Sequence, residues 1–249
     1  MNKLSPERAH PIAALVMAAV CHAAFVLAVG SMAWALASGM QIGHGSLTGV
    51  PAAIANGLLL LQFPILHSLL LSRRGAGTLR RLSPVGHGRT LAITTFALFG
   101  SVQLLATFWL WSPSGVTWHS PEGTVGMLQW AVFGLAWLFL IKALHDAGLG
   151  VQSGAAGWWA LLRGKAVNFG SMPSGGLFRG CRQPIYLGFA MVLWTAPTWS
   201  LDWLLLSLVW GSYCAIGPLL KEARWLRMYG SQFAEYRASV PYLLPRLRR

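Results

Sequence analysis

Six long apolar runs dominate this sequence and leave it little choice of architecture. They cover roughly residues 13–37, 51–71, 91–111, 125–142, 184–197 and 203–220. A helix needs about 20 apolar residues to cross a bilayer, with a range of about 17–25. Four runs meet that length, 203–220 is adequate, and 184–197 is short. Because lipid cannot hydrogen-bond to the backbone, we expect an all-α, polytopic protein with about six transmembrane helices.

The distribution of basic residues predicts the orientation of these helices. In a six-span arrangement all 19 Lys and Arg residues fall on one side, whereas segments 38–50, 112–124 and 198–202 contain none. Positively charged loops stay in the cytoplasm, so we expect both chain ends to be cytoplasmic. We interpret the net charge of +13 as topology and attraction to anionic lipid headgroups, not as nucleic-acid binding.

The N-terminal run has a rival interpretation as a cleaved signal peptide. Lys3 and Arg8 precede it, and Ala35-Leu36-Ala37 looks like a cleavage site. However, the apolar run is about 24 residues long, whereas the apolar core of a signal peptide has about 7–15. Cleavage would also leave five spans. We therefore expect this run to be a membrane span.

The chain shows no internal repeat and no long linker, so we expect one integral-membrane domain over residues 1–249. Residues 1–145 would form a four-helix scaffold, and residues 146–249 would carry the functional region. Within that region we predict an interfacial helix over 150–162 and an amphipathic cytoplasmic helix over 223–237. The three cysteines are far apart and form no CxxC pair, so they imply neither a disulfide framework nor a metal site.

The last two apolar runs should form a short helical hairpin that brings distant polar residues together. Pro197 should end the fifth helix, and Ser200 should cap the sixth. A hairpin that turns near Trp199 brings segment 182–186 to the level of segment 213–222 at the cytoplasmic interface. This meeting point is the most informative part of the sequence for function.

Few titratable residues are available there. Glu222 and Asp146 lie at inner helix ends, where ionisable side chains are costly unless paired or functional. Glu222 has two open interpretations, a structural salt bridge with Arg182 or Arg179 and a ligand contact. For Asp146 we favour a helix-end carboxylate near Lys142. Arg182 is either a topological anchor or a bidentate grip for a carboxylate or phosphate.

His67 is a further candidate, because it follows Pro64 in a helix interrupted by polar residues and could line a cavity. We favour a histidine that packs between helices.

An ordered set of residues in this region resembles a known enzyme family. It reads Gly176-Leu177-Phe178, Arg182-Gln183-Pro184-Ile185-Tyr186-Leu187-Gly188, Lys221-Glu222, Gly230, Phe233, Tyr236 and Val240-Pro241. The order is similar to that of the isoprenylcysteine carboxyl methyltransferases, integral-membrane enzymes whose relatives include phospholipid and methanethiol methyltransferases. The likeness covers residues 176–245, and a looser one to the methanethiol and nitrite-reduction-associated branch extends to His67-Ser68 and 109–118.

The resemblance implies S-adenosylmethionine as cofactor and assigns residues to it. Arg182 and Glu222 would be catalytic, and the cofactor would contact Phe178, Gln183, Pro184, Tyr186 and Glu222. The family pattern has Tyr, His and Glu at the positions of Phe178, Gln183 and Lys221, so this chain departs from it three times. Gln keeps hydrogen bonding but does not titrate, and Lys221 reverses a charge.

We therefore expect a multi-pass enzyme, in a bacterial inner membrane, that methylates a small thiol or a lipophilic acceptor. The alternative is a non-catalytic membrane protein of the same fold that assists a respiratory or nitrogen-oxide pathway, which the three departures favour. A transporter should show paired broken helices or internal symmetry, and the sequence has neither. The acceptor, the pathway and the oligomeric state stay open at this point.

Overall fold

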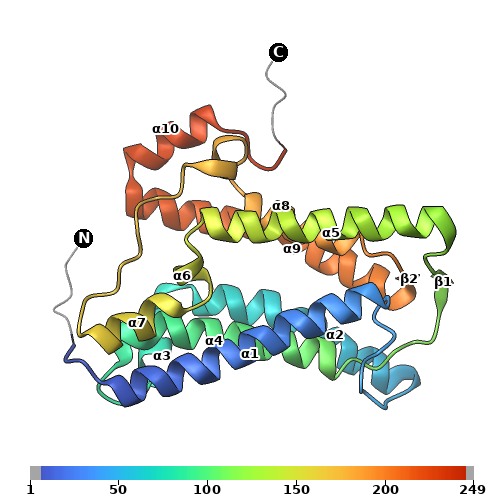
Figure 1. Ribbon diagram of the computed structural model, residues 1–249, viewed down its shortest axis with the longest axis horizontal. Helices are drawn as coiled ribbons and strands as arrows, with labels where there is room; N and C mark the ends of the chain where they lie inside the picture. The colour runs from blue at the N-terminus through green and yellow to red at the C-terminus, as the bar shows by residue number, and fades with distance from the viewer. Residues whose placement is uncertain (1–6, 245–249) are drawn as a thin grey trace. The chain divides into compact units, whose positions relative to one another are not determined.

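The computed structural model describes residues 7–244, so the basic residues Lys3, Arg246, Arg248 and Arg249 lie outside the described part. The chain is an all-α, polytopic membrane protein with two very short strands (Figure 1). Its elements are α1 (Pro11–Ala37), α2 (Gly49–Leu70), α3 (Arg73–Leu82), α4 (Gly88–Trp109), β1 (Thr117–His119), α5 (Gly123–Asp146), α6 (Leu149–Gln152), α7 (Ala155–Arg163), the 3-10 turn η1 (Gly176–Arg179), α8 (Pro184–Trp194), β2 (Trp199–Ser200), α9 (Leu201–Tyr229) and α10 (Ser231–Ser239).

Within residues 7–244, five helices are long and apolar enough to cross a membrane: α1, α2, α4, α5 and α9. The fifth apolar run of the sequence forms α8, which has only 11 residues and ends at Trp194 rather than at Pro197. An 11-residue helix is shorter than a bilayer core, so the count of six crossings stays a prediction.

The described chain divides into two compact units, the first formed by residues up to 33, 55–111 and 148–170. In it, α1, α4 and α7 share a core of Ala14, Leu91 and Leu161. Close packing of α7 on α4 is visible at Gly157, where a Cβ would lie 2.5 Å from Thr94 Oγ1. The hydroxyl of Thr94 donates to the carbonyl of Gly154 at 2.7 Å. Small residues and polar contacts thus hold these helices together, as in other membrane helix bundles.

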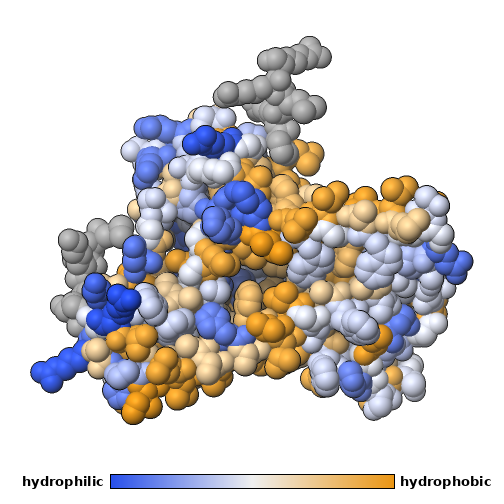
Figure 2. Space-filling model, in the orientation of Figure 1, coloured by the Kyte–Doolittle hydropathy of each residue, from blue (hydrophilic) through white to orange (hydrophobic). Residues whose placement is uncertain are grey.

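The second unit comprises residues 34–54, 112–147 and 171 onward, and it holds α5, α8, α9 and α10. α8 packs against both α5 and α9, and the three helices run side by side in Figure 1. A Cβ at Gly188 of α8 would lie 3.0 Å from Leu140 Cα of α5, so a larger residue here would require the two helices to move slightly apart. Figure 2 shows many apolar residues along the exposed surface of α5 and a mainly hydrophilic surface over α10.

At one end of this second unit, the three segments without Lys or Arg meet. β1 pairs antiparallel with β2, so segment 117–119 lies beside 199–200. The buried carboxylate of Asp202 accepts hydrogen bonds from Gln41 Nε2 at 2.7 Å, from Ser114 N at 2.9 Å and from Ser114 Oγ at 2.6 Å. These contacts join the α1–α2 connection, the α4–β1 connection and the start of α9 into one polar cluster.

Several local predictions were confirmed and others were wrong. Ser200 caps α9 as expected, since its Oγ accepts from Trp203 N at 2.9 Å. The single helix predicted over 223–237 does not exist, because α9 runs on to Tyr229 and Gly230, with φ of 56°, separates it from α10. The interfacial helix predicted over 150–162 is two helices, α6 and α7, separated at Gly154 with φ of 79°. Positive φ favours glycine and ends a helix.

Candidate active site

Arg182 and Glu222 meet where the chain enters α8 and where α9 approaches its end. Arg182 Nε donates to Glu222 Oε1 at 3.0 Å, and both residues are buried. Arg182 Nη1 also donates to the backbone carbonyls of Arg237 at 2.6 Å and Val240 at 2.9 Å. The guanidinium therefore ties the start of α8 to α9 and to the segment that follows α10. The salt bridge between Glu222 and Arg182, one of the two interpretations of Glu222, is present.

Glu222 has two further partners on neighbouring elements. Gln183 Nε2 donates to the same carboxylate oxygen at 2.9 Å, and Arg237 Nε lies 3.7 Å from the other oxygen. A buried charge is costly unless it is paired and hydrogen-bonded, and here the carboxylate is both. Its partners come from residues 182, 183 and 237, so it is the hub of the site.

Lys221, the neighbour of Glu222, has a different environment. Its ammonium donates to Gln183 Oε1 at 3.0 Å and lies 4.3 Å from the ring centroid of Trp225. The rings of Phe178 and Tyr186 follow at 5.6 and 5.8 Å. Distances within about 6 Å of a ring face are those of cation–π contacts. Three aromatic rings from η1, α8 and α9 thus surround one cation.

The turn that carries Phe178 is fixed from two sides. Asp146, at the end of α5, accepts a hydrogen bond from Leu177 N at 2.9 Å and also contacts Lys142 and His145. On the other side the phenol of Tyr236 donates to the carbonyl of Phe178 at 2.7 Å. Burial raises the pKa of Tyr236, so the phenol remains a donor at any physiological pH. Phe178 is thereby held in place beside Lys221.

Gly176 lets the turn pass directly over this carboxylate. Its φ is 56°, and a Cβ at this position would collide with the carboxylate of Asp146. The predicted helix-end carboxylate near Lys142 is therefore confirmed at Asp146, and the structure adds that it anchors the turn of Phe178.

Pro184 occupies the first turn of α8, as expected for a residue without a backbone N–H. Tyr186, half a turn further on, packs edge-on against Tyr213 of α9, with ring centroids 6.4 Å apart. Cys181 is buried, and its thiol contacts the carbonyl of Tyr242 at 3.6 Å. Burial raises the pKa of Cys181, so it stays a neutral thiol at neutral pH.

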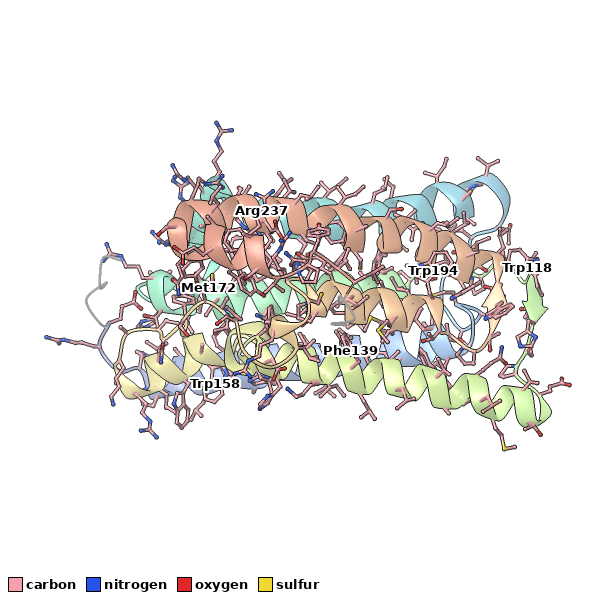
Figure 3. The ribbon with its side chains drawn as sticks, turned by 90° about the horizontal axis from the view of Figure 1, so that it is seen from above. Trp118, Phe139, Trp158, Met172, Trp194 and Arg237 are labelled. Atoms are coloured by element: carbon pink, nitrogen blue, oxygen red, sulfur yellow. The ribbon has the colours of Figure 1, made fainter. Side chains whose placement is uncertain are left out.

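The structure brings all the predicted site residues into this one cluster: Phe178, Arg182, Gln183, Pro184, Tyr186 and Glu222. Sequence reasoning missed Trp225, although its position one helical turn after Lys221 was a usable signal. It also missed Arg237, and it singled out Tyr236 and Asp146 without foreseeing their contacts with the turn of Phe178. Figure 3 shows Met172 and Arg237 toward one end of this unit and Trp194 and Trp118 toward the other.

His67 belongs to the other unit, where its ring lies 4.9 Å from Phe63 and 4.8 Å from Phe96. It packs among aromatic rings, which agrees with the interpretation of His67 as a packing residue. Within residues 7–244, no three His, Cys, Asp or Glu side chains are grouped closely enough to hold a metal ion.

Comparison with known proteins agrees with the motif of residues 176–245. The chain is 29% identical over 203 residues to a methanethiol S-methyltransferase of Pseudomonas deceptionensis, which covers 80% of this chain and 74% of that enzyme. This chain is similar to methanethiol S-methyltransferases. The resemblance to this branch is therefore confirmed.

Two other relatives extend the similarity to further bacteria. Methanethiol S-methyltransferase 2 of Bradyrhizobium diazoefficiens is 27% identical over 208 residues, which is 83% of this chain and 79% of the relative. The methanethiol S-methyltransferase of Mycobacterium tuberculosis is 28% identical over 201 residues, or 78% of each chain. No family model and no solved structure matches the chain.

Proposed function

We propose that this protein is a membrane methyltransferase that transfers a methyl group from S-adenosylmethionine to a small thiol. The observation that carries the proposal is the similarity, over about four fifths of the chain, to several enzymes named methanethiol S-methyltransferase. The alignments cover 78–83% of this chain.

The residues of the site suit the chemistry of this cofactor. When bound, S-adenosylmethionine supplies an electrophilic methyl carbon on a sulfonium cation. Aromatic faces and carboxylates stabilise cations, and the rings of Phe178, Tyr186 and Trp225 already surround one cation, the ammonium of Lys221. Glu222 adds a negative charge one residue away. The ring cluster therefore stabilises positive charge, and a sulfonium group bound there would share the rings with the ammonium of Lys221.

Arg182 can serve the cofactor only with part of its guanidinium. Nε and Nη1 are engaged by Glu222 and by two backbone carbonyls, which leaves Nη2 for a ligand carboxylate among the described contacts. We therefore assign Arg182 and Glu222 the task of building the floor of the site, and we assign Nη2 of Arg182 to the carboxylate of the ligand. Gln183 fixes the relative positions of Glu222 and Lys221, because its amide bonds to both.

Methyl transfer of this kind needs alignment and exclusion of water more than acid–base catalysis. Pro184 and the packed helices α8 and α9 provide rigid positions for the side chains. The turn of Phe178, held by Asp146 and Tyr236, covers the cation site with an apolar ring. These residues position the reactants, and a thiol that ionises needs no strong general base.

We also propose six crossings, with both chain ends in the cytoplasm and α8 and α9 forming a hairpin. Two observations support this topology. The three segments without basic residues meet around Asp202 at one end of the second unit. Arg182, Arg224, Arg227 and Arg237 belong to the segments around the site. A cytoplasmic site would be reached by a water-soluble cofactor.

Product analysis tests the proposal. The purified protein, in detergent or in liposomes, is incubated with methyl-labelled S-adenosylmethionine and a panel of thiols, and the products are identified by mass spectrometry. We expect a labelled methyl thioether. Absence of both cofactor binding and labelled product would instead favour a non-catalytic membrane protein.

A ring-deletion variant tests the site. Tyr186→Leu should weaken binding of S-adenosylmethionine several-fold, since a cation–π contact contributes about 0.5–2 kcal/mol. Trp130→Leu removes an exposed ring of α5 and serves as the matched control. An equal loss of affinity in both variants would refute the assigned position.

A further inference from the structure

Lys221 carries a positive charge at the centre of the site, and the proposed function above leaves that charge without a task. The residue is half-buried. It is hydrogen-bonded to Gln183 and faced by the rings of Trp225, Phe178 and Tyr186. An ammonium held in one position among aromatic rings is suited to bind a reactant.

The three departures from the family pattern form a single structural unit. Lys221 donates to Gln183 and lies over Phe178, so the three substituted positions contact one another through one ammonium group. The three substituted residues therefore interact directly, and the ammonium of Lys221 joins them.

The charges around Lys221 do not balance. No ion pair of Lys221 occurs within residues 7–244, and Glu222 is already engaged by Arg182, Gln183 and Arg237. The charged and titratable groups that surround the ammonium from neighbouring elements are Glu222 and Arg224 on α9, Tyr186 on α8, and Cys181 and Arg182 before α8. Cations outnumber carboxylates in this set.

A sulfonium group beside Lys221 would add another positive charge to this surplus. Like charges in a site of low dielectric repel strongly. An anion placed between ammonium and sulfonium relieves both repulsions at once, whereas an amine acceptor, protonated in water, would increase them.

We infer that Lys221 binds the acceptor sulfur in its ionised form and so selects thiolates over amine acceptors. This inference rests on the proposed methyltransferase function. In the reaction the thiol first loses its proton to water, and the ammonium of Lys221 stabilises the thiolate. A sulfur lone pair then forms the new C–S bond with the methyl carbon. As it forms, the methyl–sulfonium bond breaks and its electron pair returns to the donor sulfur, which leaves two neutral thioether sulfurs.

Two opposing trends set the rate gain that Lys221 gives when it lowers the pKa of the acceptor thiol. An opposite charge within about 4–6 Å lowers the pKa of an acid by about 1–3 units. Each unit raises the thiolate fraction about tenfold below that pKa, but it lowers nucleophilicity only about threefold for a Brønsted coefficient of about 0.4–0.5. A shift of about two units therefore gives a net gain of about tenfold at neutral pH.

The decisive variant is Lys221→Met, which keeps the length of the side chain and removes its charge. We expect kcat/KM for the thiol to fall about tenfold at neutral pH. In a plot of kcat/KM against pH, the acid limb should move to higher pH. Binding of S-adenosylmethionine, measured by calorimetry without thiol, should become several-fold tighter. Binding of S-adenosylhomocysteine should stay the same, because it lacks the positive charge. Lys221→Arg should return the acid limb toward its wild-type position.

The exposed Lys165, in the other unit, gives the matched control Lys165→Met, which should behave as wild type in every measurement. If Lys221→Met weakens both nucleosides equally, or leaves the acid limb in place, Lys221 has a structural role and the inference is overturned. If wild-type protein binds no S-adenosylmethionine and forms no product, the proposed function itself fails.

Discussion

The buried pair of Arg182 and Glu222 makes the sharpest prediction about stability. Glu222→Gln keeps the size of the side chain and removes the charge that faces Arg182 Nε at 3.0 Å. The side chains of Arg182 and Glu222 are only 11% and 6% exposed, so water cannot replace the lost partner. The variant therefore leaves a buried guanidinium whose charge is uncompensated.

Breaking a buried ion pair by removing one partner costs about 3–5 kcal/mol. The amide of glutamine still offers one acceptor oxygen, so we expect the lower end, about 3 kcal/mol. On the scale of soluble domains of similar size, 1 kcal/mol shifts the melting temperature by about 2–4 °C. The expected decrease is therefore about 6–12 °C.

Thermal unfolding in one detergent, followed by tryptophan fluorescence, measures this decrease for Glu222→Gln, Arg182→Met and the double variant. Because the two residues contact each other, the double variant should cost at least about 1 kcal/mol less than the sum of the single variants. Glu235→Gln, an exposed carboxylate on α10, should change stability by less than about 0.5 kcal/mol. Additive single effects would refute the assigned pairing.

Three further predictions concern residues around the site and at the opposite end of its unit. Tyr236→Phe removes the hydrogen bond to the carbonyl of Phe178 and should destabilise the protein by about 1 kcal/mol, while raising KM for the cofactor. Asp202→Asn should lower the melting temperature through the lost charge-assisted bonds to Ser114, at about 1.5–3 kcal/mol. Burial raises the pKa of Cys181, so the fold favours its neutral thiol over the thiolate. The contribution of this residue to the stability of the native state is complete below the ordinary thiol pKa and is lost as the pH rises above it. Maleimide labelling of Cys181 should therefore stay slow at neutral pH and accelerate only when the protein unfolds.

The meeting of Arg182 and Glu222 could be predicted because it depends on helix lengths and on one turn. α8 and α9 are joined by a short connection near Trp199 and pack against each other, and Arg182 contacts Glu222. The cap at Ser200 follows from the same local logic, since a serine before an apolar run satisfies the first free N–H groups. The cap at Ser200 depends only on residues close to it in sequence, and the contact of Arg182 with Glu222 depends on a single turn between two helices.

Other features depend on which partners packing supplies, and the sequence pattern did not reveal them. Residues 223–237 have helical spacing of apolar residues throughout, but Gly230 adopts positive φ and the chain turns into α10. That turn brings Tyr236 and Arg237 back to Phe178 and Glu222. The role of Asp146 was equally hidden, because its partner Leu177 N lies 31 residues away.

The two charges at the end of α9 are adjacent in sequence, yet the fold treats them in opposite ways. Glu222 is saturated by Arg182 and Gln183, so it stabilises the junction of α8, α9 and the C-terminal segment. Lys221 points at aromatic rings and one amide oxygen, contacts that stabilise a cation without neutralising it. With its carboxylate paired and its ammonium not neutralised, the proposed site favours an anionic reactant. Among the acceptors considered from the sequence, an ionised small thiol fits that requirement, whereas a lipid amine does not.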